Sequence, residues 1–100
     1  MLYLMEWSMK DGCAEKAVHK FLSTGAPLPE GCKLVGRWHA PGSVNGWLLA
    51  DTDDVTKVYE HASEWAELLN WKTTPVFTDE QAGLVSSAIW KIKSETGESA

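Results

Sequence analysis

A basic and an imidazole side chain lie two positions apart near the middle of the sequence, at Arg37 and His39. They belong to the run GRWHAP, which begins with strand-forming residues and ends in turn formers. Side chains alternate along a strand, so Arg37 and His39 share one face and Trp38 takes the other. Imidazole can act as a general base near neutral pH, and guanidinium stabilises negative charge. Arg37 and His39 are therefore the candidate catalytic residues and candidate ligands for an acidic or phenolic molecule.

Three further residues on predicted strands are candidate ligand-binding residues: Glu6, Trp47 and Trp71. Glu6 could complete a polar cluster with Arg37 and His39, and tryptophan rings suit the walls of a cavity for a flat organic molecule. Two plainer interpretations stay open. His39 could instead cap a hairpin through backbone hydrogen bonds, and the tryptophans could be buried at a seam between subunits.

The sequence predicts neither a metal site nor a cofactor. His19 and His61 fall on the polar faces of predicted helices and are expected to be solvated, so a site shared with His39 would need residues from opposite faces of the sheet. The acids at positions 51–54 lack the spacing and glycine of a calcium loop. Glycine-rich phosphate loops and a serine-hydrolase elbow are also absent from the sequence.

Composition narrows the class of protein. A chain of 100 residues with 44% hydrophobic and 23% charged residues can build one core and excludes long disorder. A net charge of −5 argues against non-specific nucleic-acid binding. No apolar run approaches the ~18 residues of a membrane span, and the first residues lack the basic region of a signal peptide. Cys13 and Cys32 could form a disulfide but are favoured as free thiols, so we expect a cytoplasmic protein.

Four stretches rich in aromatic and large apolar residues are predicted strands, at residues 2–8, 32–39, 46–51 and 70–77. Helical spacing predicts one helix that ends at Gly25 and a second that begins at residues 52–54 and places Trp65 in the core.

A capping box at residues 78–81 opens a last helix through about Trp90, with Ala82, Val85 and Ile89 expected to point inward. Residues 1–90 are then one domain, and residues 91–100 are expected to form a polar tail.

The order of these elements, β-α-β-β-α-β plus a C-terminal helix, predicts an α+β fold. Right-handed crossovers place both helices on one face of an antiparallel sheet, and the usual strand order for this pattern is 4-1-3-2. That order puts the strand containing Pro75 at an edge, where the missing N–H is tolerated. We therefore predict a ferredoxin-like sandwich.

The first and third strands carry large apolar residues on both faces. Tyr3, Met5 and Trp7 oppose Leu2 and Leu4 on the first strand. The face without helices then needs a cover, and we expect a second copy of the chain to stack on it sheet to sheet. The predicted assembly is a homodimer in the form of a dimeric α/β-barrel.

Several motifs resemble a small bacterial family of domains of unknown function in the dimeric α/β-barrel (ferredoxin-like) group. They are MLY at the start, LPEG at 28–31, GRWHAP at 36–41, SEW at 63–65 and PV at 75–76. The resemblance covers about residues 1–85 and implies the fold and the dimer but no activity. The wider group contains cofactor-independent monooxygenases, heme-degrading enzymes, muconolactone isomerases and stress-responsive proteins, and fold alone does not choose among them.

Two functions fit these observations. The first is a non-catalytic dimeric barrel that binds a small organic molecule or a partner protein in an accessory or regulatory role. The alternative is a cofactor-independent monooxygenase- or isomerase-like enzyme for a small aromatic substrate, with His39 as base and Arg37 stabilising negative charge. The enzyme requires a cavity into which both side chains point.

Overall fold

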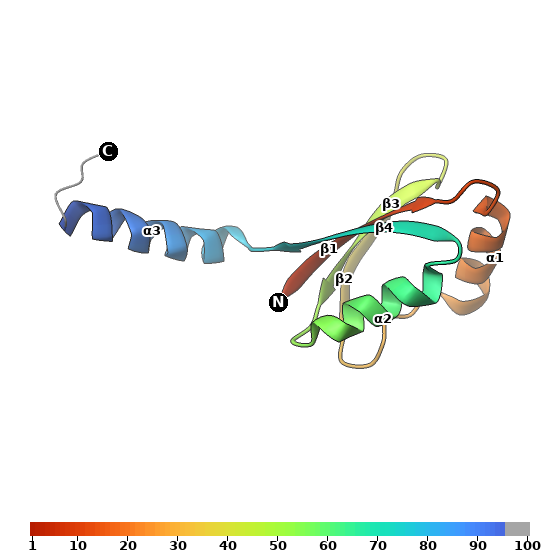
Figure 1. Ribbon diagram of the computed structural model, residues 1–100, viewed down its shortest axis with the longest axis horizontal. Coiled ribbons are helices and arrows are strands. Elements are labelled where there is room, and N and C mark those ends of the chain that lie inside the picture. The colour runs from red at the N-terminus through yellow and green to blue at the C-terminus, as the bar shows by residue number, and fades with distance from the viewer. Residues whose placement is uncertain (96–100) are drawn as a thin grey trace.

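The computed structural model describes the backbone of residues 1–95 and the side chains of residues 1–91. In chain order, the elements are β1 (Leu2–Met9), α1 (Ala14–Thr24), β2 (Lys33–His39), β3 (Asn45–Asp51), α2 (Val55–Trp65), β4 (Leu69–Val76) and α3 (Asp79–Glu95) (Figure 1). This order confirms the predicted β-α-β-β-α-β pattern followed by a C-terminal helix.

The strands form one antiparallel sheet in the order β2-β3-β1-β4, which is the predicted ferredoxin-like order counted from the other edge. β4 is an edge strand, and its Pro75 lies opposite Tyr3 of β1. An edge position tolerates a residue that has no N–H to donate.

The two faces of the sheet differ in what covers them. Tyr3, Met5 and Trp7 of β1 are buried against the helices, together with Leu48 and Ala50 of β3. We call this side the helix face. The alternate residues, Leu2, Leu4 and Glu6 of β1, Trp47 and Leu49 of β3, and Trp38 of β2, lie on the side that we call the open face.

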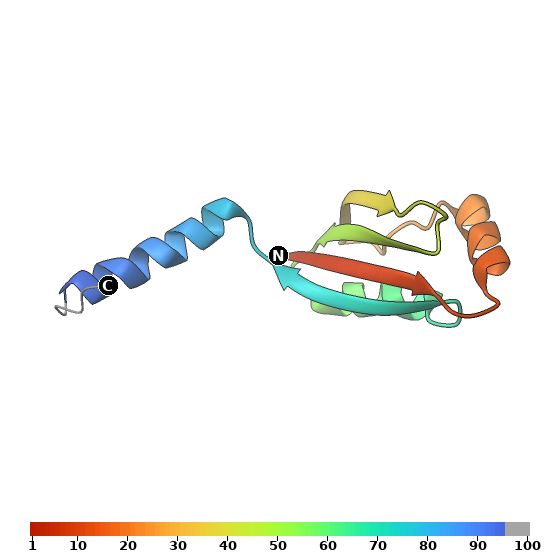
Figure 2. The ribbon, with the colours of Figure 1, turned by 90° about the horizontal axis from the view of Figure 1, so that it is seen from above.

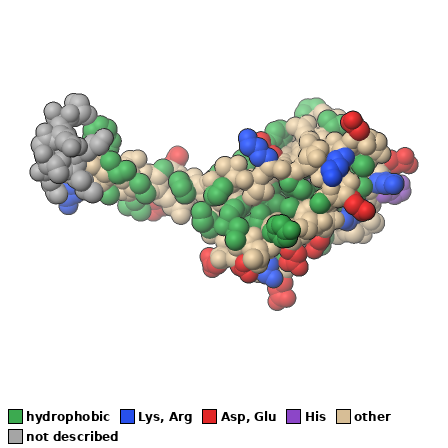
Figure 3. Space-filling view, viewed as in Figure 1, with side chains coloured by type: hydrophobic (Ala, Val, Ile, Leu, Met, Phe, Trp, Pro, Cys, Tyr) green, Lys and Arg blue, Asp and Glu red, His purple; other side chains and the backbone are tan. Residues whose placement is uncertain are grey.

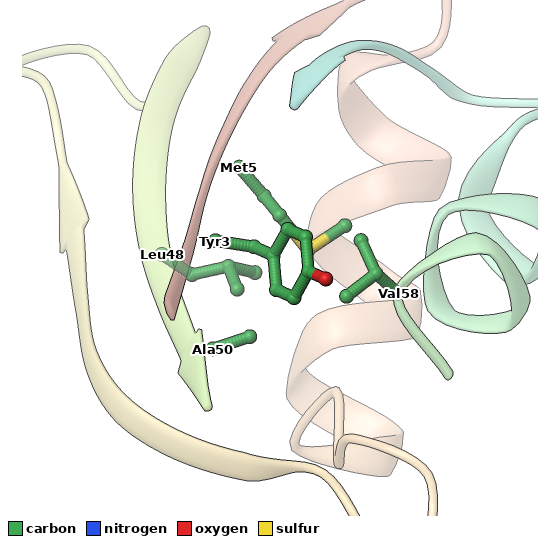
Figure 4. Close-up of a cluster of buried hydrophobic side chains, with 5 residues drawn as sticks. All are labelled: Tyr3, Met5, Leu48, Ala50 and Val58. Carbon is green, nitrogen blue, oxygen red and sulfur yellow. The ribbon is translucent and has the colours of Figure 1, made fainter. Parts of the chain in front are cut away.

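Two clusters form the core between the helix face and the helices. In the first, Val58 of α2 packs against Tyr3, Met5, Leu48 and Ala50 of the two central strands (Figure 4). The second cluster joins α1, α2 and the sheet, and its buried members are Trp7, Ala17, Ala26, Trp65 and Leu69. Trp65 is thus a core residue, as its place on the apolar stripe of α2 predicts.

α3 begins at the predicted capping box. The Thr78 backbone N–H donates to Gln81 Oε1 over 2.9 Å, and the Gln81 N–H donates to Thr78 Oγ1 over 3.1 Å. The helix then projects away from the sheet, so the molecule measures 60 × 28 × 18 Å (Figures 1 and 2). None of the helices within residues 1–95 is both long and apolar enough to cross a bilayer.

Two expectations for the C-terminal region are corrected. The side chains of Ala82, Val85 and Ile89 are exposed rather than turned inward, because α3 projects away from the sheet. The polar composition from residue 91 onward also does not end the helix, which continues to Glu95 because charged residues are compatible with a solvated helix. The rest of the expected tail, residues 96–100, lies outside the described residues.

Candidate ligand-binding cavity

A cavity of about 370 Å³ lies between α1, α2 and the helix face of the sheet. Its walls are mostly apolar, and aromatic rings come from each layer: Phe21 from α1, Trp65 from α2, and Trp7 and Trp71 from the sheet. Four polar side chains also line the cavity: Arg37, His39, Ser43 and His61. This combination of an apolar wall and a few convergent polar groups is typical of a small-molecule site.

Two residues that line the cavity each have a buried polar atom without a hydrogen-bond partner, His61 Nδ1 and Trp71 Nε1. His61 comes from α2 and is only 2% exposed, and Trp71 comes from β4. Their rings meet edge to face with centroids 5.8 Å apart. Unpartnered buried polar atoms are rare in native proteins, because each costs about 1–3 kcal/mol relative to a paired atom.

The imidazole of His61 is held in its neutral form. Burial, with the nearby positive charges of Arg37 and Lys20, lowers the pKa of His61 to about 4. At neutral pH one ring nitrogen then donates a hydrogen bond and the other accepts one. His61 can therefore bind a ligand as a neutral hydrogen-bonding group, without adding charge to the cavity.

Arg37 supplies the positive charge of the cavity. Its Nη2 donates to the carbonyl of Ala26 over 2.6 Å and its Nη1 to that of Gly25 over 3.4 Å, and the guanidinium lies 5.7 Å from the Phe21 ring centroid. Burial lowers the pKa of Arg37, yet an arginine remains cationic at neutral pH. No ion pair to Arg37 occurs among the side chains described, and no Asp or Glu lines the cavity there.

His39, at the end of β2, has an exposed side chain that lines the cavity. Its ring packs edge to face on Trp7 and on Phe21, with centroids 5.4 and 5.3 Å away. The hairpin that follows is closed by backbone bonds, from Ala40 N–H to the Asn45 carbonyl and from Ser43 N–H to the Ala40 carbonyl. The imidazole is therefore placed at the solvent side of the cavity, against its aromatic wall.

The cluster expected from sequence is divided between the two faces of the sheet. Arg37, His39 and Trp71 line the cavity together, whereas Glu6 and Trp47 lie on the open face. There the Trp47 Nε1–H donates to Glu6 Oε1 over 3.1 Å. The strand pleat causes this division, since it directs Trp7 into the cavity and its neighbour Glu6 away from it.

His61 is the residue that the sequence analysis assigned wrongly, because it is buried rather than solvated. The helical spacing contained a signal for this position. His61 follows Val58 by three residues and precedes Trp65 by four, so it belongs to the same buried stripe. Within residues 1–91, no group of three or more His, Cys, Asp or Glu side chains could hold a metal ion.

Of the comparisons with known proteins, the one with models of protein families assigns the chain to a family. No curated protein matches it, and no solved structure matches its fold with significance. The family model described as "Domain of unknown function (DUF3303)" matches residues 1–90. That match covers the sheet, α1, α2 and most of α3, so the chain belongs to the DUF3303 family.

Proposed function

We propose that this protein binds a small organic anion with a flat ring in the cavity between the helices and the sheet, in an accessory or regulatory role. The observation that carries the proposal is an apolar cavity lined by Arg37, His61 and Trp71, the last two of which each have a buried polar atom, Nδ1 and Nε1, without a hydrogen-bond partner. Both atoms are covered in this structure, so a ligand would supply the missing hydrogen bonds after a small shift of these two side chains.

The size and lining of the cavity support a small ligand. At about 370 Å³ the cavity lies near the lower end of the range for ligand pockets, about 300–1,000 Å³, which suits one or two fused rings. Aromatic walls favour a flat ring, and Trp71 Nε1 can donate only to an acceptor such as a ligand oxygen. The small volume of the cavity favours a small molecule over a protein partner.

Charge supports an anion. Arg37 has no ion-pair partner among the described residues, and Lys20 adds a second positive charge near His61. A carboxylate or phenolate would find a guanidinium already oriented by two backbone carbonyls. We further propose a cytoplasmic location on the ground that Cys13 and Cys32 are both free thiols.

Binding of defined probes tests the proposal. Benzoate, salicylate and naphthoate are titrated by calorimetry, with benzamide as the uncharged analogue, alongside native mass spectrometry of protein isolated from its own host. We expect Arg37→Gln to weaken the anions about tenfold or more and to leave benzamide unchanged, as loss of a charged hydrogen bond predicts.

Trp71→Phe keeps the aromatic ring and removes only the N–H, so it is expected to weaken binding of the anions several-fold. Trp47→Phe is its matched control, because Trp47 lies on the open face, away from the cavity. Equal effects of the two tryptophan changes, or no binding of any probe and no added mass on the isolated protein, would refute the proposal.

A second candidate function rests on a separate observation, that Arg37 and His39 both line the cavity. This is the arrangement required by a cofactor-independent monooxygenase- or isomerase-like enzyme for a small aromatic substrate. In that case His39 takes a proton from the substrate and Arg37 stabilises the resulting anion. His39→Ala would then abolish turnover, followed as product mass or oxygen uptake, while leaving binding of the anion within a few-fold. Unchanged turnover in that variant excludes His39 as the base.

A further inference from the structure

Two surfaces that carry apolar side chains are not covered by any of the residues that the structure describes. The open face carries Leu4, Leu49 and Trp38, of which Trp38 is 54% exposed. Along α3, Leu84, Val85 and Ile89 are 70%, 60% and 48% exposed. Figure 3 shows hydrophobic side chains along the projecting helix. Contiguous exposed apolar surface of this kind marks an interaction site.

The start of α3 directs the helix away from its own sheet. β4 ends at Val76, and the reciprocal hydrogen bonds of Thr78 and Gln81 fix the start of the helix at Asp79, three residues later. The helix continues outward from the sheet edge, in both views (Figures 1 and 2). A helix of 17 residues standing alone in water is only marginally stable, so α3 needs a surface to pack on.

Three apolar residues of α3 form a stripe, and Leu84 and Trp90 lie outside it. Ala82, Val85 and Ile89 are three and four residues apart and fall on one side of the helix, whereas Ser87 falls on the opposite side. The stripe also matches the open face in length. A helix of 17 residues is about 25 Å long, and strands of seven or eight residues are likewise about 25 Å long.

Two ways of pairing two copies bury similar areas and differ in which apolar surfaces they cover. The open face measures roughly 450 Å² from strand spacing and length, so stacking two sheets buries about 900 Å² and leaves both α3 helices bare. One α3 laid on one open face buries about 250 Å² on each side. Reciprocal exchange makes two such contacts and buries about 1,000 Å² in total, which reaches the threshold of a specific interface and covers both α3 stripes and about half of each open face.

We propose that α3 is an exchanged arm: its stripe of Ala82, Val85 and Ile89 packs on the open face of a second copy of this chain, whose own α3 packs on the first. This inference concerns the opposite side of the sheet from the ligand cavity and does not depend on it. The second copy is favoured as the occupant because one chain carries both surfaces, matched in length and in apolar character.

Charge substitutions in the full chain test the exchange, with sedimentation measured over a range of concentrations and circular dichroism to verify folding. Ile89→Asp on α3 and Leu49→Lys on the open face are each expected to raise the dimer dissociation constant at least about tenfold, since each buries a charge in place of an aliphatic side chain. Ser87→Asp is the matched control on the other side of α3 and leaves the dimer unchanged.

Mixing the two variants gives the decisive measurement. In a reciprocal exchange, the unaltered α3 of Leu49→Lys can still pack on the unaltered open face of Ile89→Asp, so the mixture forms a dimer that neither variant forms alone. A dimer that survives Ile89→Asp would instead show sheets stacked without α3. Loss of the dimer on Ile89→Asp but not on Leu49→Lys would show α3 pairing with α3. Either result, or a monomer of the unaltered chain at all concentrations, overturns the proposal.

Discussion

At the scale of single residues, the sequence predicts the place of some polar residues of the cavity and not of others. Arg37 and His39 share a face because they are two residues apart on β2, and that spacing predicts their joint presence at the cavity. Glu6 and Trp47 were grouped with them wrongly, because both faces of β1 and β3 are apolar and alternation alone does not say which face the helices cover. His61 is buried although its side chain is polar, because its spacing to Val58 and Trp65 places it on the buried side of α2.

The lowered pKa of His61 predicts how stability depends on pH. The unfolded chain takes up a proton on this imidazole near pH 6.5, whereas the folded chain does so only near pH 4, mainly because of burial. The unfolded state thus binds more protons in this window, and the free energy of unfolding contributed by His61 is present above pH 6.5 and is lost as the pH falls to 4, by at most about 3 kcal/mol.

Urea unfolding between those two pH values measures this effect. We expect His61→Gln to flatten the decline of the unfolding free energy with falling pH, and His19→Gln, at an exposed position on α1, to leave it unchanged. An equal decline in the His61 variant would mean that another group causes the loss of stability.

At the scale of elements, Gly46 and Gly83 differ in whether their surroundings leave room for a side chain. Gly46 begins the buried part of β3, and a Cβ there would collide with the Trp7 ring and with the backbone carbonyl oxygen of Trp38. The backbone cannot yield as a side chain can, so Gly46→Ala is expected to destabilise the fold by about 2 kcal/mol or more. Gly83 lies inside α3 with open space around it, and Gly83→Ala is expected to stabilise that helix by about 1 kcal/mol.

Thermal unfolding of both variants separates these effects. Gly46→Ala lowers the Tm, whereas Gly83→Ala leaves the Tm the same or higher and increases the helical signal. A neutral Gly46→Ala would show that β3 and the Trp7 ring have room to shift.

Element order and strand order were predictable because each rests on a local signal joined to a general rule. Apolar spacing and turn residues predict the strands and helices, right-handed crossovers select the topology, and Pro75 assigns β4 to an edge. The direction of α3 was not predictable in the same way. A capping box and an apolar stripe predict a helix with a partner, but they do not say whether the partner surface belongs to the same chain.

At the scale of the whole molecule, the two proposals occupy opposite sides of one sheet. The cavity lies between the helix face and the helices, and the exchanged arm is proposed to cover the open face. Because β1 and β3 contribute alternate residues to each side, the two sites share strands but no side chains. Ligand binding and self-association should therefore contribute separately to stability.

Melting curves at several protein concentrations test this independence. If α3 is exchanged, the Tm of the unaltered chain rises with protein concentration by mass action, whereas that of Ile89→Asp does not. An anion that binds the cavity should raise the Tm of both proteins by a similar amount, because Ile89 does not line the cavity. Stabilisation by the anion in the dimer alone would contradict that independence and would mean that the open face and the cavity are coupled through the sheet.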